Sequence, residues 1–150
     1  MSNLKTIFVA LFLLSFILHV EAQTPFTLTG IKSYYPVVEL NTDKIDAKYK
    51  EQILDMLIKK STKLGIETKN FSSRSLAFLI SFIGVGDTLA LKMELMVGEN
   101  AMRLDTKEEV FVISYMNGRI FVPQELEEQL IDNAEELLDM FETQYKEDNL

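Results

Sequence analysis

The chain has 150 residues, of which 47% are hydrophobic and 25% are charged, and its formal net charge is −8. This length suits a single domain. The negative charge argues against sequence-independent binding to a nucleic-acid backbone, which requires clustered lysine and arginine. The sequence contains no cysteine, which excludes disulfides, thiolate metal ligands, cysteine nucleophiles and a lipoprotein acylation site.

The amino-terminal segment has the composition of a signal peptide. Lys5 precedes a nearly unbroken apolar run from Ile7 to Val20, and the small residue Ala22 precedes Gln23 at a plausible cleavage point. As a helix the run would rise about 21 Å, less than the roughly 30 Å hydrocarbon core of a bilayer. We therefore predict a signal peptide over residues 1–22 and one domain over residues 23–150. An uncleaved amino-terminal membrane anchor is the alternative.

Cleavage would leave few catalytic residue types. The one histidine, His19, lies inside the apolar run, so residues 23–150 contain no histidine, cysteine or tryptophan. Ser-His-Asp and Cys-His catalysis and the usual zinc sites are then excluded. We expect a protein that is not an enzyme and has no cofactor or metal. The alternative is a small enzyme that uses only carboxylate, lysine or tyrosine chemistry.

The first half of the mature chain predicts a strand followed by a helix. Residues 26–40 have the composition of an irregular strand, and Pro36 favours an edge position because it cannot donate a ladder hydrogen bond. Residues 43–64 place apolar side chains at three- and four-residue steps, which indicates an amphipathic helix. Gly65 is a natural helix stop, and Ile66 is placed to pack back on the last turn.

Three strands and a second helix follow. We predict strands over residues 76–83, 88–97 and 109–116, the first of them central because it is apolar on both faces. Gly84–Asp87 predicts a tight hairpin, residues 98–100 a looser connection, and residues 117–118 another turn. After Pro123, a second apolar stripe extends from Leu126 to Tyr145.

The predicted order is strand, helix, three strands, helix. This order favours an α+β fold, a two-layer sandwich in which two amphipathic helices cover one face of a mainly antiparallel sheet.

Three surfaces are candidates for partner binding. Tyr34, Tyr35 and Val37 lie in a strand that could be an exposed edge, although the tyrosines could instead cap the core. Residues 124–150 hold ten acids and one base; Glu128, Glu135 and Asp139 of this stretch could bind a basic partner, or form the solvated side of the helix. A third candidate is an exposed apolar patch formed by Val85, Met96 and Ile120.

These features favour an exported accessory or binding protein, periplasmic or secreted. Its expected partner is another protein of the cell envelope, a second copy of itself, or an apolar ligand, and we expect no nucleic acid and no membrane span in the mature chain. A tethered accessory subunit would result if the amino-terminal segment stayed uncleaved.

Overall fold

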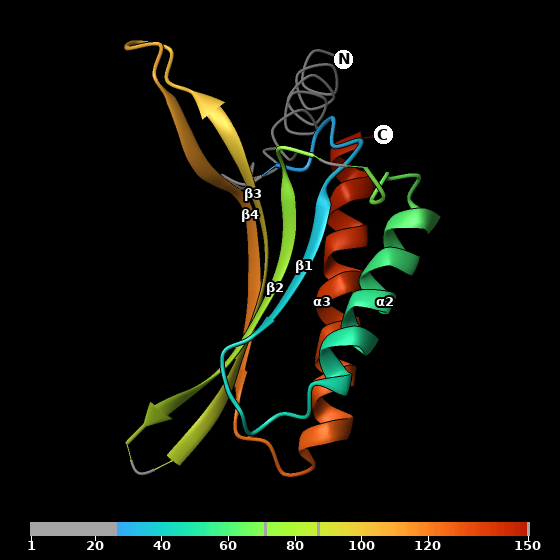
Figure 1. The fold of residues 1–150 in the computed structure, drawn as a ribbon, viewed down its shortest axis with the longest axis vertical. Helices are drawn as coiled ribbons and strands as arrows, with labels where there is room; N and C mark the ends of the chain where they lie inside the picture. The colour runs from blue at the N-terminus through green and yellow to red at the C-terminus, as the bar shows by residue number, and fades with distance from the viewer. Residues whose placement is uncertain (1–26, 71, 87, 150) are drawn as a thin grey trace, which may run out of the picture.

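The protein is a four-stranded sheet with two helices on one face (Figure 1). A computed structural model describes residues 27–70, 72–86 and 88–149, so the predicted signal peptide lies outside the described residues. The elements are β1 (Tyr35–Leu40), α2 (Lys48–Lys63), β2 (Ser75–Val85), β3 (Thr88–Met102), β4 (Glu109–Phe121) and α3 (Leu126–Asn149).

The strands lie in the order β1-β2-β3-β4; β1 pairs with β2 in parallel, and the other two pairs are antiparallel. The predicted α+β class and element order are confirmed. The interior position of β2 and the edge position of Pro36 are confirmed as well.

The first strand is shorter than predicted. Only residues 35–40 of the predicted 26–40 form a strand, and residues 27–34 form an irregular segment with a turn at Gly30, where φ is +72°. Leu28 and Ile31 of this segment are buried in the core. The Tyr145 hydroxyl donates a hydrogen bond to the Ile31 carbonyl at 3.0 Å, which fixes the segment against α3.

Helix α2 begins later than predicted and ends as predicted. It starts at Lys48 rather than at residue 43. At this start the backbone N–H of Lys48 donates a hydrogen bond to the Asp46 carboxylate at 2.9 Å. At its end Gly65 adopts a φ of +73°, and the Ile66 N–H donates to the Ser61 carbonyl at 2.9 Å. This is the Schellman arrangement, which satisfies carbonyls that the helix end leaves unpaired.

Strands β3 and β4 are longer than predicted, and the expected connection at 98–100 and turn at 117–118 are wrong. Gly98 and Gly118 lie inside paired strands, opposite Ile113 and Glu94. A Cβ at Gly118 would lie 2.9 Å from the Met93 carbonyl oxygen, and one at Gly98 would meet the Phe111 ring. Both glycines therefore allow a neighbouring strand or side chain to approach the backbone closely, which is a known role of glycine inside strands as well as in turns.

The hairpin between β2 and β3 is confirmed. Val85 pairs with Thr88, and Gly86 has a φ of +59°, as a tight two-residue connection requires.

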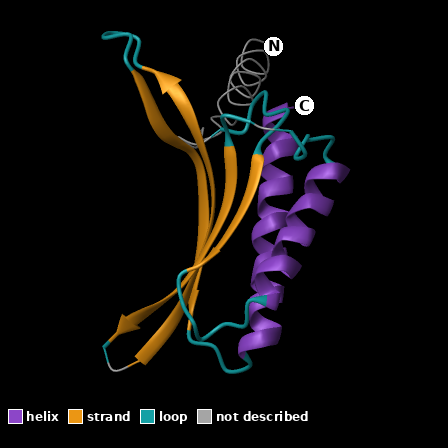
Figure 2. Cartoon of the chain, viewed as in Figure 1, coloured by secondary structure: helices purple, strands orange, loops and turns teal. Residues whose placement is uncertain are grey.

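The core lies between the helices and the sheet. It is formed by one face of the strands, including Phe78, Met93 and Leu95, against the inner stripes of α2 and α3, including Leu57 and Leu137. Figure 2 shows both helices on the same side of the sheet. Both hairpin ends of the sheet bend away from the helices (Figure 1). Among the described helices, none is long and apolar enough to span a membrane.

Candidate functional site

The predicted tyrosine pair is divided between the core and the surface. Tyr34 is fully buried, and its hydroxyl is hydrogen bonded to Ser61. The expectation that Tyr34 contacts a partner directly is therefore corrected, because this residue precedes the strand and caps the core. Burial raises the pKa of the Tyr34 phenol, and the hydrogen bond between Tyr34 and Ser61 offsets only part of this effect. Tyr35 is 56% exposed, and Val37 is half-buried.

The three acidic candidates of α3 all lie on the surface of the helix, but they have different neighbours. Asp139 forms an ion pair with Lys60 of α2. Glu128 and Glu135 are exposed, and within the described part of the chain neither forms an ion pair. Asp139 therefore helps to join the two helices, whereas Glu128 and Glu135 remain available to a partner.

The sheet face opposite the helices, here called the open face, has an apolar row across all four strands. Val37 pairs in register with Ala77, Ala77 with Met96, and Met96 with Met116. Residues paired on the same face of adjacent strands are close enough for their side chains to interact. The structure thus brings the predicted residues Val37 and Met96 together with Met116.

A second set of apolar side chains adjoins this row. Phe111 is 67% exposed and packs over Gly98, Ile113 pairs with Gly98, and both residues lie on the open face. Ile120, which is 60% exposed, pairs with Lys92 on the far side of the row. Of the predicted patch, Ile120 is exposed and Met96 is half-buried on the same face, with the Glu94–Gly118 pair between them. The side chain of Val85 lies outside the described set, so the patch stays a prediction.

Charged side chains on the open face and at its margin pair with one another. Lys92 and Glu94 of β3 are 2.8 Å apart on the open face, whereas the Arg74–Glu99 pair, at 2.7 Å, follows the alternation of Leu76 and Val97 onto the helix side of the sheet. The Lys92–Glu94 pair neutralises these two charges of the open face beside its apolar row.

Sequence reasoning missed Phe111, Ile113 and Met116. The apolar run Val110–Ile113 was a usable signal for an exposed apolar face. A strand that is covered on a single face needs apolar residues only at alternate positions, so a continuous run places some of them on the open face. The register between strands, which places these residues beside Met96, is not visible in the local pattern.

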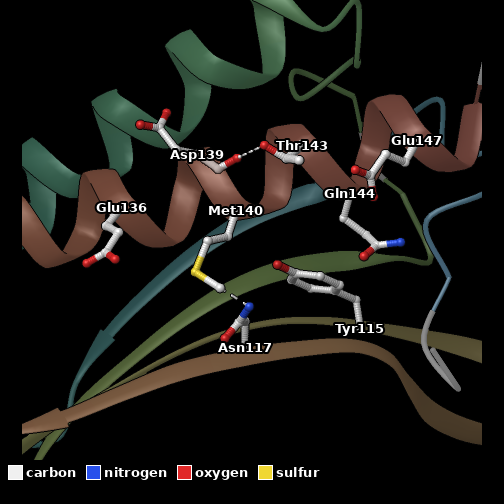
Figure 3. A pocket seen from close by; sticks show the side chains of 8 residues that line it. All are labelled: Tyr115, Asn117, Glu136, Asp139, Met140, Thr143, Gln144 and Glu147. Atoms are coloured by element: carbon white, nitrogen blue, oxygen red, sulfur yellow. Dashed lines mark hydrogen bonds between the residues drawn. The ribbon is translucent and has the colours of Figure 1, made fainter. Parts of the chain in front are cut away.

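A groove of about 340 Å³ lies at the other side of β4, between that strand and α3 (Figure 3). Tyr115 and Asn117 of β4 line it together with α3 residues that include Met140, Gln144 and Glu147. Tyr115 packs edge-to-face on Phe141, with the ring centroids 5.5 Å apart. The phenol is buried, which raises its pKa.

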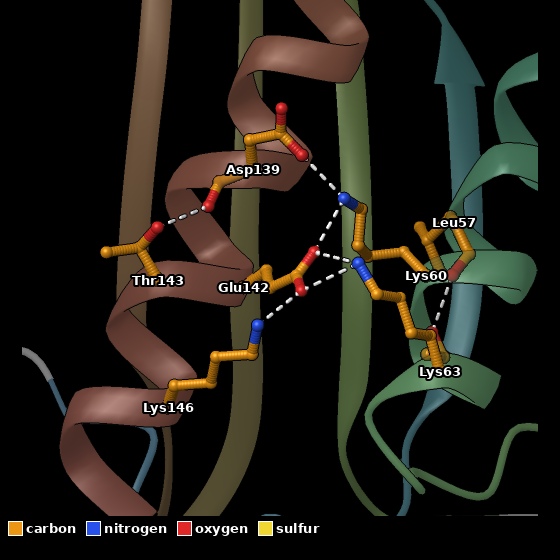
Figure 4. A network of polar contacts seen from close by, with 8 residues as sticks. Leu57, Lys60, Lys63, Asp139, Glu142, Thr143 and Lys146 are labelled. Carbon is orange, nitrogen blue, oxygen red and sulfur yellow. Dashed lines mark hydrogen bonds and ion pairs between the residues drawn. The ribbon is translucent and has the colours of Figure 1, made fainter.

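An ion cluster centred on Glu142 joins the two helices (Figure 4). The Glu142 carboxylate is 2.6 Å from the ammonium of Lys146, 2.7 Å from that of Lys60 and 3.0 Å from that of Lys63. Hydrogen bonds from these three lysines hold the pKa of Glu142 well below its usual range. The cluster fixes α2 against α3, and both oxygens of the Glu142 carboxylate are paired with lysines.

The described residues contain no group of three His, Asp or Glu side chains placed to hold a metal ion. No protein-family model matches the chain, and no curated protein sequence matches it. One solved structure with some similarity is a minor lipoprotein from Acinetobacter baumannii, with 12% sequence identity and a TM-score of 0.27. The match covers 76% of this chain and 91% of that one, and at this level of similarity it assigns no family.

Proposed function

We propose that this protein is an exported, non-enzymatic binding protein of the cell envelope that holds an apolar segment of another protein against its open face. The observation that carries the proposal is the apolar row formed by Val37, Ala77, Met96 and Met116, with Ile113 and Phe111 beside it. Neither α2 nor α3 covers this row, because both lie on the opposite face of the sheet (Figure 2).

The dimensions of the row suit a protein segment. Four strands about 4.8 Å apart span about 14 Å, and neighbouring rows lie about 7 Å apart along a strand. An amphipathic helix has a diameter of about 10–12 Å. A solvated sheet face ordinarily carries polar residues at such positions, and a contiguous apolar surface marks an interaction site.

The strands bend away from the helices at both ends (Figure 1), which makes the open face concave. A concave face brings side chains from both ends of the sheet toward one bound segment. Tyr35 of β1 and Phe111 of β4 flank the row on the same side along the strands, near its two opposite ends. Export rests on the signal-peptide pattern of residues 1–22.

Position-specific photocrosslinking in the native host tests the proposal. A benzophenone amino acid at Ile113 should crosslink to a specific envelope protein, and the same probe at exposed Asp132 of α3 is the matched control. Met116→Lys should abolish the product from Ile113, because a charge in the row opposes an apolar partner.

Identical products from both positions, or a product that survives Met116→Lys, would contradict the proposal. Self-crosslinks alone would indicate a homo-oligomer, and a lipid retained in native mass spectrometry would indicate an apolar ligand; either result would replace the proposed partner. The intact mass of the envelope form tests export separately, because cleavage after Ala22 leaves a chain that begins at Gln23.

A further inference from the structure

The groove between α3 and β4 contains an unsatisfied hydroxyl group. Tyr115 is only 4% exposed, and within the described residues its phenol oxygen has no hydrogen-bond partner. The nearby Asn117 side chain offsets part of the rise that burial causes in the Tyr115 pKa, but its amide donates its hydrogen bond to the Met140 sulfur, at 3.7 Å. Figure 3 shows the phenol oxygen pointing toward α3 between Met140 and Gln144. A buried hydroxyl without a partner is unfavourable, so a ligand that reaches it and hydrogen bonds to it is favoured.

The charges around the groove favour a cation. Glu136 is paired with Arg119 and Asp139 with Lys60, whereas Glu147 forms no ion pair with any described residue. The Gln144 amide nitrogen donates to Asp148 at 2.8 Å, which leaves its amide oxygen as an acceptor. An anion would meet this carboxylate-rich helix unfavourably.

The nature of the groove walls favours an organic cation over a metal ion. Two of the three lining carboxylates are already neutralised by Arg119 and Lys60. A neutral phenol whose pKa is raised by burial is a poor metal ligand but a competent hydrogen-bond acceptor. Met140 offers an apolar, flexible thioether beside the phenol, which can move to admit a methylene chain.

We propose that this groove binds an alkylammonium group. The ammonium donates hydrogen bonds to the Tyr115 phenol oxygen and faces the Glu147 carboxylate, and the alkyl chain packs against Met140. The group could belong to a free amine or to a lysine side chain of a protein. This site lies on the helix side of β4 and does not depend on the open face.

Titration calorimetry with the folded mature protein at low ionic strength tests this proposal. One arm uses n-pentylammonium chloride and the other a blocked Gly-Lys-Gly peptide, so the tighter of the two identifies the source of the group. We expect saturable binding with a dissociation constant below about 1 mM. Tyr115→Phe and Glu147→Gln should each weaken binding about tenfold, because each removes a charge-assisted interaction.

Glu128→Gln is the matched control, because it removes an exposed acid of the same helix that does not line the groove. Tetramethylammonium has the same charge but no N–H donor and should bind about tenfold more weakly than n-pentylammonium. Absence of saturable binding would overturn the proposal. Equal losses in Glu128→Gln and Glu147→Gln, or equal affinity for tetramethylammonium, would also overturn it by showing a diffuse charge effect. Glu147 lies on the helix surface, so its variant remains informative even if Tyr115→Phe does not fold.

Discussion

Replacement of Glu142 by Gln tests how the two helices are held together. The Glu142 side chain is 10% exposed, and its carboxylate contacts the ammonium groups of Lys60, Lys63 and Lys146 (Figure 4). Lys60 is itself mostly buried, whereas Lys63 and Lys146 are more than half exposed. The glutamine keeps the size of the side chain and removes its charge.

The loss should be dominated by Lys60. A hydrogen bond to a charged group contributes about 1.5–3 kcal/mol, and exposed ion pairs contribute about 0–1 kcal/mol each. Lys60 retains Asp139 after the change, which limits the penalty for leaving its charge unpaired. We therefore expect Glu142→Gln to lower the free energy of unfolding by about 2 kcal/mol at pH 7, a decrease in Tm of about 6–10 °C for a domain of this size.

The effect should depend on pH. The three lysines lower the pKa of Glu142 in the folded state below its usual value of 4.5. The unfolded chain therefore binds a proton first as the pH falls, so the stabilisation is complete above about pH 4.5 and is lost as the pH drops toward the folded pKa. The difference in stability between wild type and Glu142→Gln should shrink over the same range.

Urea unfolding followed by circular dichroism at pH 7 and at pH 3.5 measures both effects. Glu135→Gln is the control, because Glu135 is an exposed acid of the same helix with no ion pair to any described residue. Equal costs for the two variants at pH 7 would refute the argument. A difference between wild type and Glu142→Gln that stays constant down to pH 3.5 would refute the pH dependence.

Three further predictions concern the fold and the open face. Gly65→Ala should lower the free energy of unfolding by about 1–2 kcal/mol in urea titrations, because Gly65 has a φ of +73°. Leu95→Ala should cost about 2–5 kcal/mol in the same assay, because the side chain is fully buried in the core; a cost below 1 kcal/mol would place Leu95 outside the core. The double variant Ile113→Thr/Met116→Gln should change the free energy of unfolding by no more than about 0.5 kcal/mol. It should also bind less of an apolar fluorescent dye than the wild type. Unchanged dye binding would show that the open face is not the exposed apolar surface.

The helices and most of the sheet could be predicted because their side-chain periodicity reflects burial on one face. The apolar stripe of α3 from Leu126 to Tyr145 is of this kind, and so is the alternation in β3 around Leu95. The ends of the elements were harder. Gly98 and Gly118 resemble turn residues in the sequence, but here they permit the close approach of Phe111 and of the Met93 carbonyl, which only the paired strand reveals.

The candidate sites depend even more on contacts distant in sequence. Tyr34 and Tyr35 are neighbours in the chain, yet one is buried and the other exposed. The apolar row exists because Val37 of β1 and Met116 of β4 are brought into one line by three successive strand pairings. No local pattern contains that register, so sequence reasoning found Val37 and Met96 separately and did not find Met116.

A single β-bulge in β4 decides which side chains of this strand face the open face and which face the groove beside α3. Val97 pairs with Tyr115 but the next residue, Gly98, pairs with Ile113, so Ser114 has no partner in β3. In a regular strand Ile113 and Met116, three residues apart, would lie on opposite faces. The bulge shifts this alternation by one residue, so that both apolar side chains lie on the open face while Tyr115 points to α3 and the groove. A bulge can redirect side chains in this way, and here it separates the apolar open face from the groove beside α3 on the two sides of one strand.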